Sequence, residues 1–148
     1  MNNAYSIPVY SANVKEHFGM IDKLLIDDFS KGSVLWGIDG DWMVNFIPAG
    51  VKFYPTDHCG VLRVDETKMN THFVMFMLDI AGQQAAFNRS NRASIDRIKS
   101  LSIPNVPLEV QNKVMAEVEE YEAIIAEAQK KMSQCAEQKK DILSSYIL

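Results

Sequence analysis

The segment with the richest recognition chemistry is residues 88–94, Asn-Arg-Ser-Asn-Arg-Ala-Ser, hereafter the arginine loop. An arginine pairs with phosphate or donates two hydrogen bonds to guanine, an asparagine matches the edge of adenine, and a serine both donates and accepts. These residue types favour contacts to DNA, and the candidates are Asn88, Arg89, Ser90, Asn91 and Arg92. The alternative interpretation is a polar loop whose Ser94 caps the next helix.

A second candidate segment is Gly37-Ile-Asp-Gly-Asp41, hereafter the hairpin loop, which lies between two apolar runs that each carry a tryptophan. An aspartate at the tip of such a loop can accept from the amino group of cytosine, although phosphates repel it. A lysine nearby can contact phosphate, but a solvated lysine is the simpler interpretation. At least one indole is expected in the core. The candidates for DNA contact here are Lys31, Trp36, Asp39 and Asp41.

We find no set of residues typical of an enzyme. The sequence lacks a glycine-rich phosphate loop, a helix with paired histidines, a Gly-x-Ser-x-Gly turn, and the Asn/Asp-Pro-Pro-aromatic tetrapeptide of amino-group DNA methyltransferases. His58, Cys59 and His72 do not have the number or spacing of a zinc site. Asp27-Asp28 and the loop aspartates are more typical of turns than of a magnesium site. We therefore expect a non-catalytic protein that needs no cofactor and no metal.

Composition indicates a globular protein of 148 residues with 47% hydrophobic and 23% charged residues. No apolar run approaches the roughly 20 residues that cross a bilayer, and two cysteines suggest no disulfide framework. We therefore expect a cytoplasmic protein with no membrane contact. The net charge of −4 resides mainly after Pro107, where eight acidic residues face five lysines. A basic patch around the arginine loop is compatible with that distribution.

The pattern of apolar runs and turns predicts a β-rich body followed by helices. Short strands or extended segments are expected at 5–10, 24–26, 34–36, 42–46, 51–54 and 59–64. A helix capped by Asn70 or Thr71 is expected to end at Gly82, and a shorter one capped by Ser94 covers residues 95–100. The apolar stripe expected on the first of these helices is Phe73, Phe76, Met77 and Ile80.

The segment after Pro107 contains no glycine or proline, and its apolar residues follow a heptad. This pattern predicts one long helix that buries a narrow stripe, most simply against a second chain, in a homodimer. A helix packed on its own domain is the alternative. The predicted interface residues are Val114, Val118, Tyr121, Ile125, Ala128, Met132, Cys135, Ile142 and Tyr146. Lys139 is the one polar interruption.

The second half of the chain resembles the end of a target recognition domain in type I restriction–modification specificity subunits. The resemblance rests on His72–Leu78, Arg89–Ile95 and Leu101–Gln111, followed by the long helix. The connector Ile103-Pro-Asn-Val-Pro-Leu-Glu-Val-Gln111 is similar to the Ile-Pro-x-Pro-Pro-Leu-x-x-Gln of that family, with Val106 replacing a proline. Two features depart from the pattern, because a full subunit has two recognition domains and two long helices, and its usual opening strand and helix are not seen before Ile7.

The resemblance implies an α+β fold, with a compact β-rich target recognition domain at 1–104 and a coiled-coil dimerisation helix at 105–148. It also implies recognition of a half-site in double-stranded DNA, together with an adenine methyltransferase subunit and a motor–nuclease subunit. Two alternatives remain open, a coiled-coil protein–protein adaptor that does not bind DNA, and the recognition end of a fused methyltransferase–nuclease.

Overall fold

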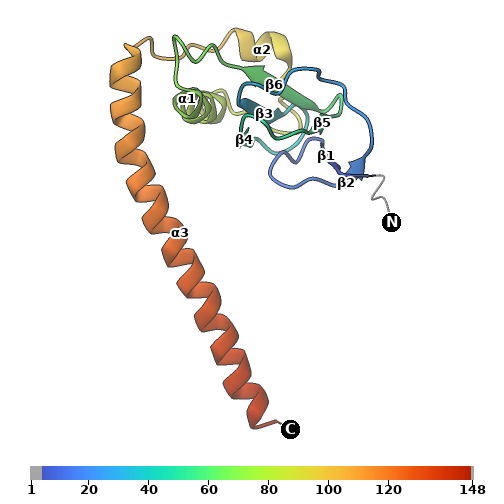
Figure 1. Ribbon diagram of the computed structural model, residues 1–148, viewed down its shortest axis with the longest axis vertical. Helices are drawn as coiled ribbons and strands as arrows, with labels where there is room; N and C mark the ends of the chain where they lie inside the picture. The colour runs from blue at the N-terminus through green and yellow to red at the C-terminus, as the bar shows by residue number, and fades with distance from the viewer. Residues whose placement is uncertain (1–4, 148) are drawn as a thin grey trace. The chain divides into compact units, whose positions relative to one another are not determined.

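All strands that the structure describes precede residue 64, and the helices follow residue 70 (Figure 1). The computed structural model describes residues 5–147, and the chain divides into two units, residues 1–111 and 112–148. The predicted α+β class, a β-rich part followed by a long helix, is confirmed. The elements are β1 (Ile7–Tyr10), β2 (Gly19–Ile21), β3 (Ser33–Gly37), β4 (Val44–Ile47), β5 (Tyr54–Pro55), β6 (Cys59–Arg63), α1 (Thr71–Gln84), α2 (Ile95–Lys99) and α3 (Leu108–Ser145).

The central sheet has the order β4-β3-β6, with both neighbours antiparallel to β3. The predicted hairpin is confirmed, since β3 pairs with β4 from Ser33↔Ile47 to Trp36↔Val44. Trp42, expected in the second strand, lies before it. Every residue of β3 is buried, because successive side chains point to opposite faces and both faces are covered.

Two hydrophobic clusters cover these faces. Val34 and Trp36 pack with Leu78, Phe87 and Ile98 from the helical side. Leu35 belongs to a second cluster with Val14, Ile47, Phe53 and Cys59. The period-2 alternation along β3 thus divides the core into two, and it fixes the register that places the hairpin loop at one end of the strand.

A second sheet, of order β2-β1-β5, contains the predicted strand at the start of the chain. The strand predicted at Leu24–Ile26 is wrong, because this segment has no strand and the exposed fraction of Leu25 is 62%. The antiparallel neighbour of β1 is instead β2, which was not predicted. Of the region expected at 51–54, only Tyr54 lies in a strand, β5, and Val51 is exposed. A short apolar run has too little periodicity to distinguish these cases.

Helix α1 begins as predicted, because the Asn70 side chain accepts from the backbone N–H of Phe73. The helix does not end at Gly82 but continues to Gln84. Gly82 instead admits an indole, since a Cβ there would lie 2.1 Å from the ring of Trp42. The predicted apolar stripe is also shifted. Its buried members are Phe73, Val74 and Leu78, whereas Phe76 and Met77 are half-buried and Ile80 is exposed.

Helix α2 begins after Ser94, whose side chain accepts from the N–H of Arg97 as predicted. The proline-containing connector after it is held by Gln111, a polar residue with an exposed fraction of only 1%. Its Oε1 accepts from the N–H of Asn70 at 2.9 Å, and its Nε2 donates to the carbonyl of Val106 at 2.8 Å. Because both ends of the amide are satisfied, burial of this side chain fixes the connector to the start of α1.

Helix α3 is continuous over 38 residues, as the heptad pattern predicts. At 1.5 Å per residue it extends roughly 57 Å. None of the described helices combines the length and the apolarity needed to cross a membrane.

Candidate functional site

The hairpin loop and the arginine loop lie side by side, although about 50 residues separate them in sequence. The N–H of Ala93 donates to the carbonyl of Ile38 at 2.9 Å, and the Trp36 indole donates to the carbonyl of Ala93 at 2.9 Å. The N–H of Ile38 in turn donates to the carbonyl of His58 at 3.0 Å, which adds the turn between β5 and β6. The two segments selected from the sequence therefore form one surface.

Two ion pairs connect the loops. Arg89 Nε lies 3.3 Å from Asp41 Oδ1, and Arg92 Nη2 lies 3.3 Å from Asp39 Oδ2. The Arg89 and Asp41 side chains are 78% and 72% exposed, whereas Asp39 is only 21% exposed. The exposed Arg89–Asp41 pair contributes about 0–1 kcal/mol, so it orients the Arg89 guanidinium and adds little to the stability of the fold.

The two asparagines of the arginine loop form bonds to its own backbone. Asn88 Oδ1 accepts from the N–H of Ser90 and of Asn91, and its Nδ2 donates to the carbonyl of Ala86. Asn91 Nδ2 donates to the carbonyls of Ala85 and Ala86. Ala86 itself has φ +56°, an uncommon conformation for a residue with a Cβ. These bonds give the asparagines a shaping role, and Ser90 is exposed at the loop.

Trp36, predicted to contact DNA, lies in the core instead. Its exposed fraction is 3%, and its ring lies against Gly60, where a Cβ would come within 2.1 Å of the indole. Because its only polar group is bonded to Ala93, this residue positions the arginine loop from beneath. The prediction of a direct contact is corrected accordingly. The alternation of side chains along β3 and the need to bury a large ring both favour the core position.

Lys31 is exposed but lies before β3, whereas the hairpin loop follows it. The five-residue strand between them spans roughly 16 Å. The carbonyl of Lys31 accepts from Arg63 Nη2 at 3.4 Å, and Arg63 Nη1 donates to the carbonyl of Asp28 at 2.6 Å. The structure therefore does not bring Lys31 together with the other candidates.

His58 belongs to the site, although it was not among the predicted site residues. Its Nδ1 lies 2.6 Å from Asp39 Oδ2, so Asp39 pairs with both His58 and Arg92. His58 lies immediately before β6, and its contact with Asp39 depends on the register between β3 and β6. No local sequence pattern indicates that register. Its neighbour Cys59 is buried, and burial raises the pKa of that thiol to about 12. The thiol therefore remains protonated and unreactive.

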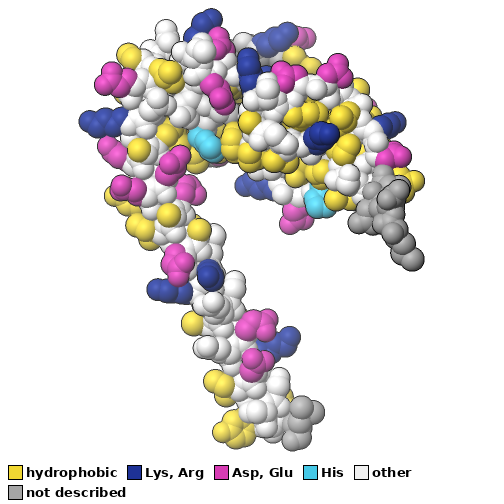
Figure 2. All heavy atoms as spheres, in the orientation of Figure 1, with side chains coloured by type: hydrophobic (Ala, Val, Ile, Leu, Met, Phe, Trp, Pro, Cys, Tyr) yellow, Lys and Arg dark blue, Asp and Glu magenta, His cyan; other side chains and the backbone are white. Residues whose placement is uncertain are grey.

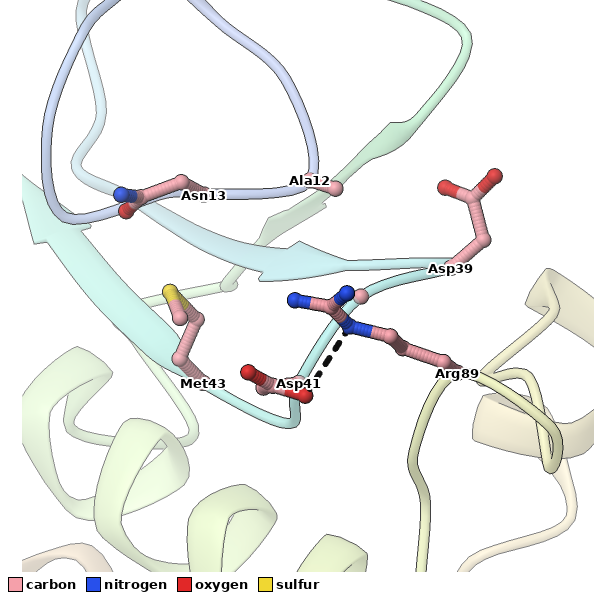
Figure 3. A pocket seen from close by; sticks show the side chains of 7 residues that line it. Ala12, Asn13, Asp39, Asp41, Met43 and Arg89 are labelled. Carbon is pink, nitrogen blue, oxygen red and sulfur yellow. Dashed lines mark hydrogen bonds and ion pairs between the residues drawn. The ribbon is translucent and has the colours of Figure 1, made fainter.

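Ala12, Asn13, Asp39, Gly40, Asp41, Met43 and Arg89 line a pocket of about 350 Å³, hereafter the interloop pocket (Figure 3). Figure 3 shows the Arg89 side chain reaching from the arginine loop towards the hairpin loop, with its terminal nitrogens directed into the space near Asn13 and Met43. The loop after β1, which supplies Ala12 and Asn13, was not predicted to take part. Gly40 and Gly37 permit its close approach, because a Cβ at Gly37 would lie 2.3 Å from the Ala12 carbonyl oxygen.

The second unit offers a different kind of surface. Most of the predicted heptad residues on α3 are exposed, among them Tyr121 at 68% and Met132 at 72%, while Val118 is half-buried. Figure 2 shows apolar side chains along α3 interspersed with charged ones of both signs. This is the surface expected of an amphipathic helix before it pairs.

Within residues 5–147, no cluster of three or more histidine, cysteine, aspartate or glutamate side chains has the arrangement of a metal site.

Comparison with known proteins gives one consistent result. The profile of the type I restriction modification DNA specificity domain matches residues 1–144. A putative type I specificity subunit of Mycoplasma pneumoniae, S.MpnORF507P, is 33% identical over 115 residues, which cover 76% of this chain and 31% of that protein. The specificity subunit of the type I restriction enzyme MpnII of the same organism is 30% identical over 115 residues, covering 76% of this chain and 34% of that one. No solved structure matches significantly.

The chain matches only part of these relatives. The share of each relative's length covered by the alignments lies between 31% and 48%.

Proposed function

The chain belongs to the family of type I restriction modification DNA specificity domains, and we propose that it supplies sequence-specific DNA contacts to a restriction–modification complex. The observation that carries the proposal is the convergence of the hairpin loop and the arginine loop, which presents Arg89 and Arg92 on one surface with side chains 78% and 57% exposed. In this role the chain is a cytoplasmic, non-catalytic component, and residues 1–104 act as its target recognition domain.

The electrostatics of the loops support DNA binding in spite of the acidic composition. In the unbound chain each arginine is paired with an aspartate, at 3.3 Å in both cases. The pair of Arg89 with Asp41 is exposed and uses only Nε of Arg89, so the terminal nitrogens can meet a phosphate or a base edge while the pair remains. His58 and Arg92 both contact Asp39, which holds the Arg92 guanidinium at the loop surface, where it can meet a DNA phosphate.

Residues 105–148 are proposed to pair with a second long helix, supplied by another copy or by another part of a specificity subunit. The support is the exposed heptad stripe on α3, which a coiled coil would bury. The paired helices would hold an adenine methyltransferase subunit and, with it, the motor–nuclease subunit, so that catalysis and cofactor come from those proteins.

The proposal is tested by titrating labelled duplexes with the chain and its methyltransferase subunit at low and moderate salt. We expect affinity to fall steeply with salt, because each phosphate contact contributes about 0.9 to the slope of log K against log salt. Arg89→Ala combined with Arg92→Ala is expected to abolish binding. Unchanged binding by the double variant would reject the loop assignment.

A protein–protein adaptor is the second candidate function, and the exposed apolar stripe of α3 is the observation that favours it. An adaptor of this kind forms stable dimers but has no salt-dependent affinity for any duplex. The same titration therefore distinguishes the two functions.

A further inference from the structure

The two aspartate–arginine pairs in the loops differ in what they leave available. Asp39 pairs with His58 Nδ1 and with Arg92, and its side chain is 21% exposed. Asp41 receives one bond, from Arg89 Nε, and is 72% exposed. Among residues 5–147, the two terminal nitrogens of Arg89 have no hydrogen bond or ion pair. The second carboxylate oxygen of Asp41 has none either. The Asp41–Arg89 pair is therefore the one that still has donors and an acceptor available for a ligand.

In the unbound chain the Asp41–Arg89 pair already favours one direction of the guanidinium group. The Nε contact to Asp41 holds the guanidinium so that its two terminal nitrogens point into the interloop pocket (Figure 3). The pocket places two adjacent donors beside a carboxylate acceptor in one opening. A side chain already fixed in its binding direction loses less conformational entropy when it binds.

Only one base-pair edge matches this order of groups. In the major groove a guanine presents two adjacent acceptors, N7 and O6, and its cytosine presents the N4 amino donor beside them. In an A·T pair the adenine acceptor is followed by a donor, and the thymine methyl group lies at the other end. The fork of Arg89 then meets one acceptor only, and the Asp41 carboxylate faces the thymine O4, which is an acceptor and repels it.

We propose that the Asp41–Arg89 pair reads one G·C base pair through the major groove, with Arg89 donating to guanine N7 and O6 and Asp41 accepting from cytosine N4. This rests on the proposed DNA-binding function. In the neighbouring Asp39–His58–Arg92 cluster the carboxylate is already occupied. Arg92 of this cluster then contacts the phosphate backbone of the DNA.

The test uses the full chain with its methyltransferase subunit and duplexes selected from random sequence. At the position read by the pair, replacing guanine by 7-deazaguanine removes the N7 acceptor and is expected to weaken binding, at most by the roughly 5- to 150-fold typical of a bidentate contact. Inosine retains N7 and O6 and removes only the minor-groove amino group, so it should bind as guanine does.

Two variants test whether the Asp41–Arg89 pair is responsible for the preference for G·C. Arg89→Ala is expected to abolish the preference for G·C at that one position. Asp41→Ala, which removes the acceptor for cytosine N4, is expected to weaken that preference, and both variants should leave the preferences at other positions unchanged. Lys68→Ala is the matched control, because that side chain is also 78% exposed and lies beyond the far end of the central sheet. It should change no base preference. Circular dichroism of each variant verifies that the fold is retained.

Specific binding in which Arg89→Ala weakens all sequences equally would make Arg89 a phosphate contact and overturn the G·C assignment, while the proposed function would stand. The same holds if 7-deazaguanine is tolerated at every position. Absence of any sequence preference in the wild-type complex would instead contradict the proposed function itself.

Discussion

At the scale of single residues, glycines decide where the two tryptophans lie. Gly60 and Gly82 each leave space that an indole fills, and a Cβ at either position would come within 2.1 Å of a ring. Trp36 then bonds Ala93, while Trp42 donates to the carbonyl and the carboxylate of Asp79 on α1. The Trp36 indole thereby connects the arginine loop to the hairpin, and the Trp42 indole connects α1 to it.

This packing predicts that Gly60→Ala destabilises the first unit. The added methyl group must displace a buried indole, and overpacking of this kind typically costs about 1–3 kcal/mol. Gly19→Ala is the control, since a Cβ there meets nothing within 4 Å. Chemical denaturation of both variants measures the difference, and equal stabilities would show that the indole of Trp36 moves freely.

The sequence alone identified most of the residues that meet at the loops, because arginine, asparagine and aspartate in glycine- or serine-containing loops are recognisable by type. It could not assign their roles. That Asn88 and Asn91 bond their own backbone, that Trp36 lies beneath the loop, and that His58 joins Asp39 all depend on register and tertiary contacts.

At the scale of elements, the predictions succeeded where the pattern was long or its turn chemistry was specific. The hairpin around residues 37–41, the Asn70 and Ser94 caps and the continuous helix of α3 are examples. They failed at Leu24–Ile26 and at Gly82, where a short apolar run and a single glycine each have two interpretations. A helical glycine that accommodates a ring has the same sequence signature as one that ends a helix.

The connector gives a prediction at this scale. Gln111→Ala removes the acceptor for the Asn70 N–H and the donor to Val106. Loss of buried hydrogen bonds of this kind costs about 1–3 kcal/mol, so we expect a lower free energy of unfolding. Gln134→Ala on the exposed part of α3 should have little effect. If both variants unfold at the same denaturant concentration, the Gln111 bonds do not hold the connector.

At the scale of the whole molecule, the exposed stripe of α3 predicts self-association. Ile125→Asp places a charge in the centre of the stripe and should convert dimers to monomers, because an unpaired carboxylate is costly in an apolar interface. Ala123→Asp introduces the same charge at an exposed position away from the stripe and should leave dimers intact. Light scattering after size-exclusion chromatography gives the masses. A wild-type chain that is monomeric at all concentrations would contradict pairing between two copies.

The proposed function requires that the hairpin loop and the arginine loop form the surface that meets DNA. The most direct test is site-specific photocross-linking, with a photoreactive residue replacing either Ser90 in the arginine loop or Lys68 beyond the far end of the central sheet. In the proposed complex with a methyltransferase subunit on a selected duplex, we predict cross-links to bases from position 90 and none from position 68. Cross-linking from position 68 but not from position 90 would contradict the account.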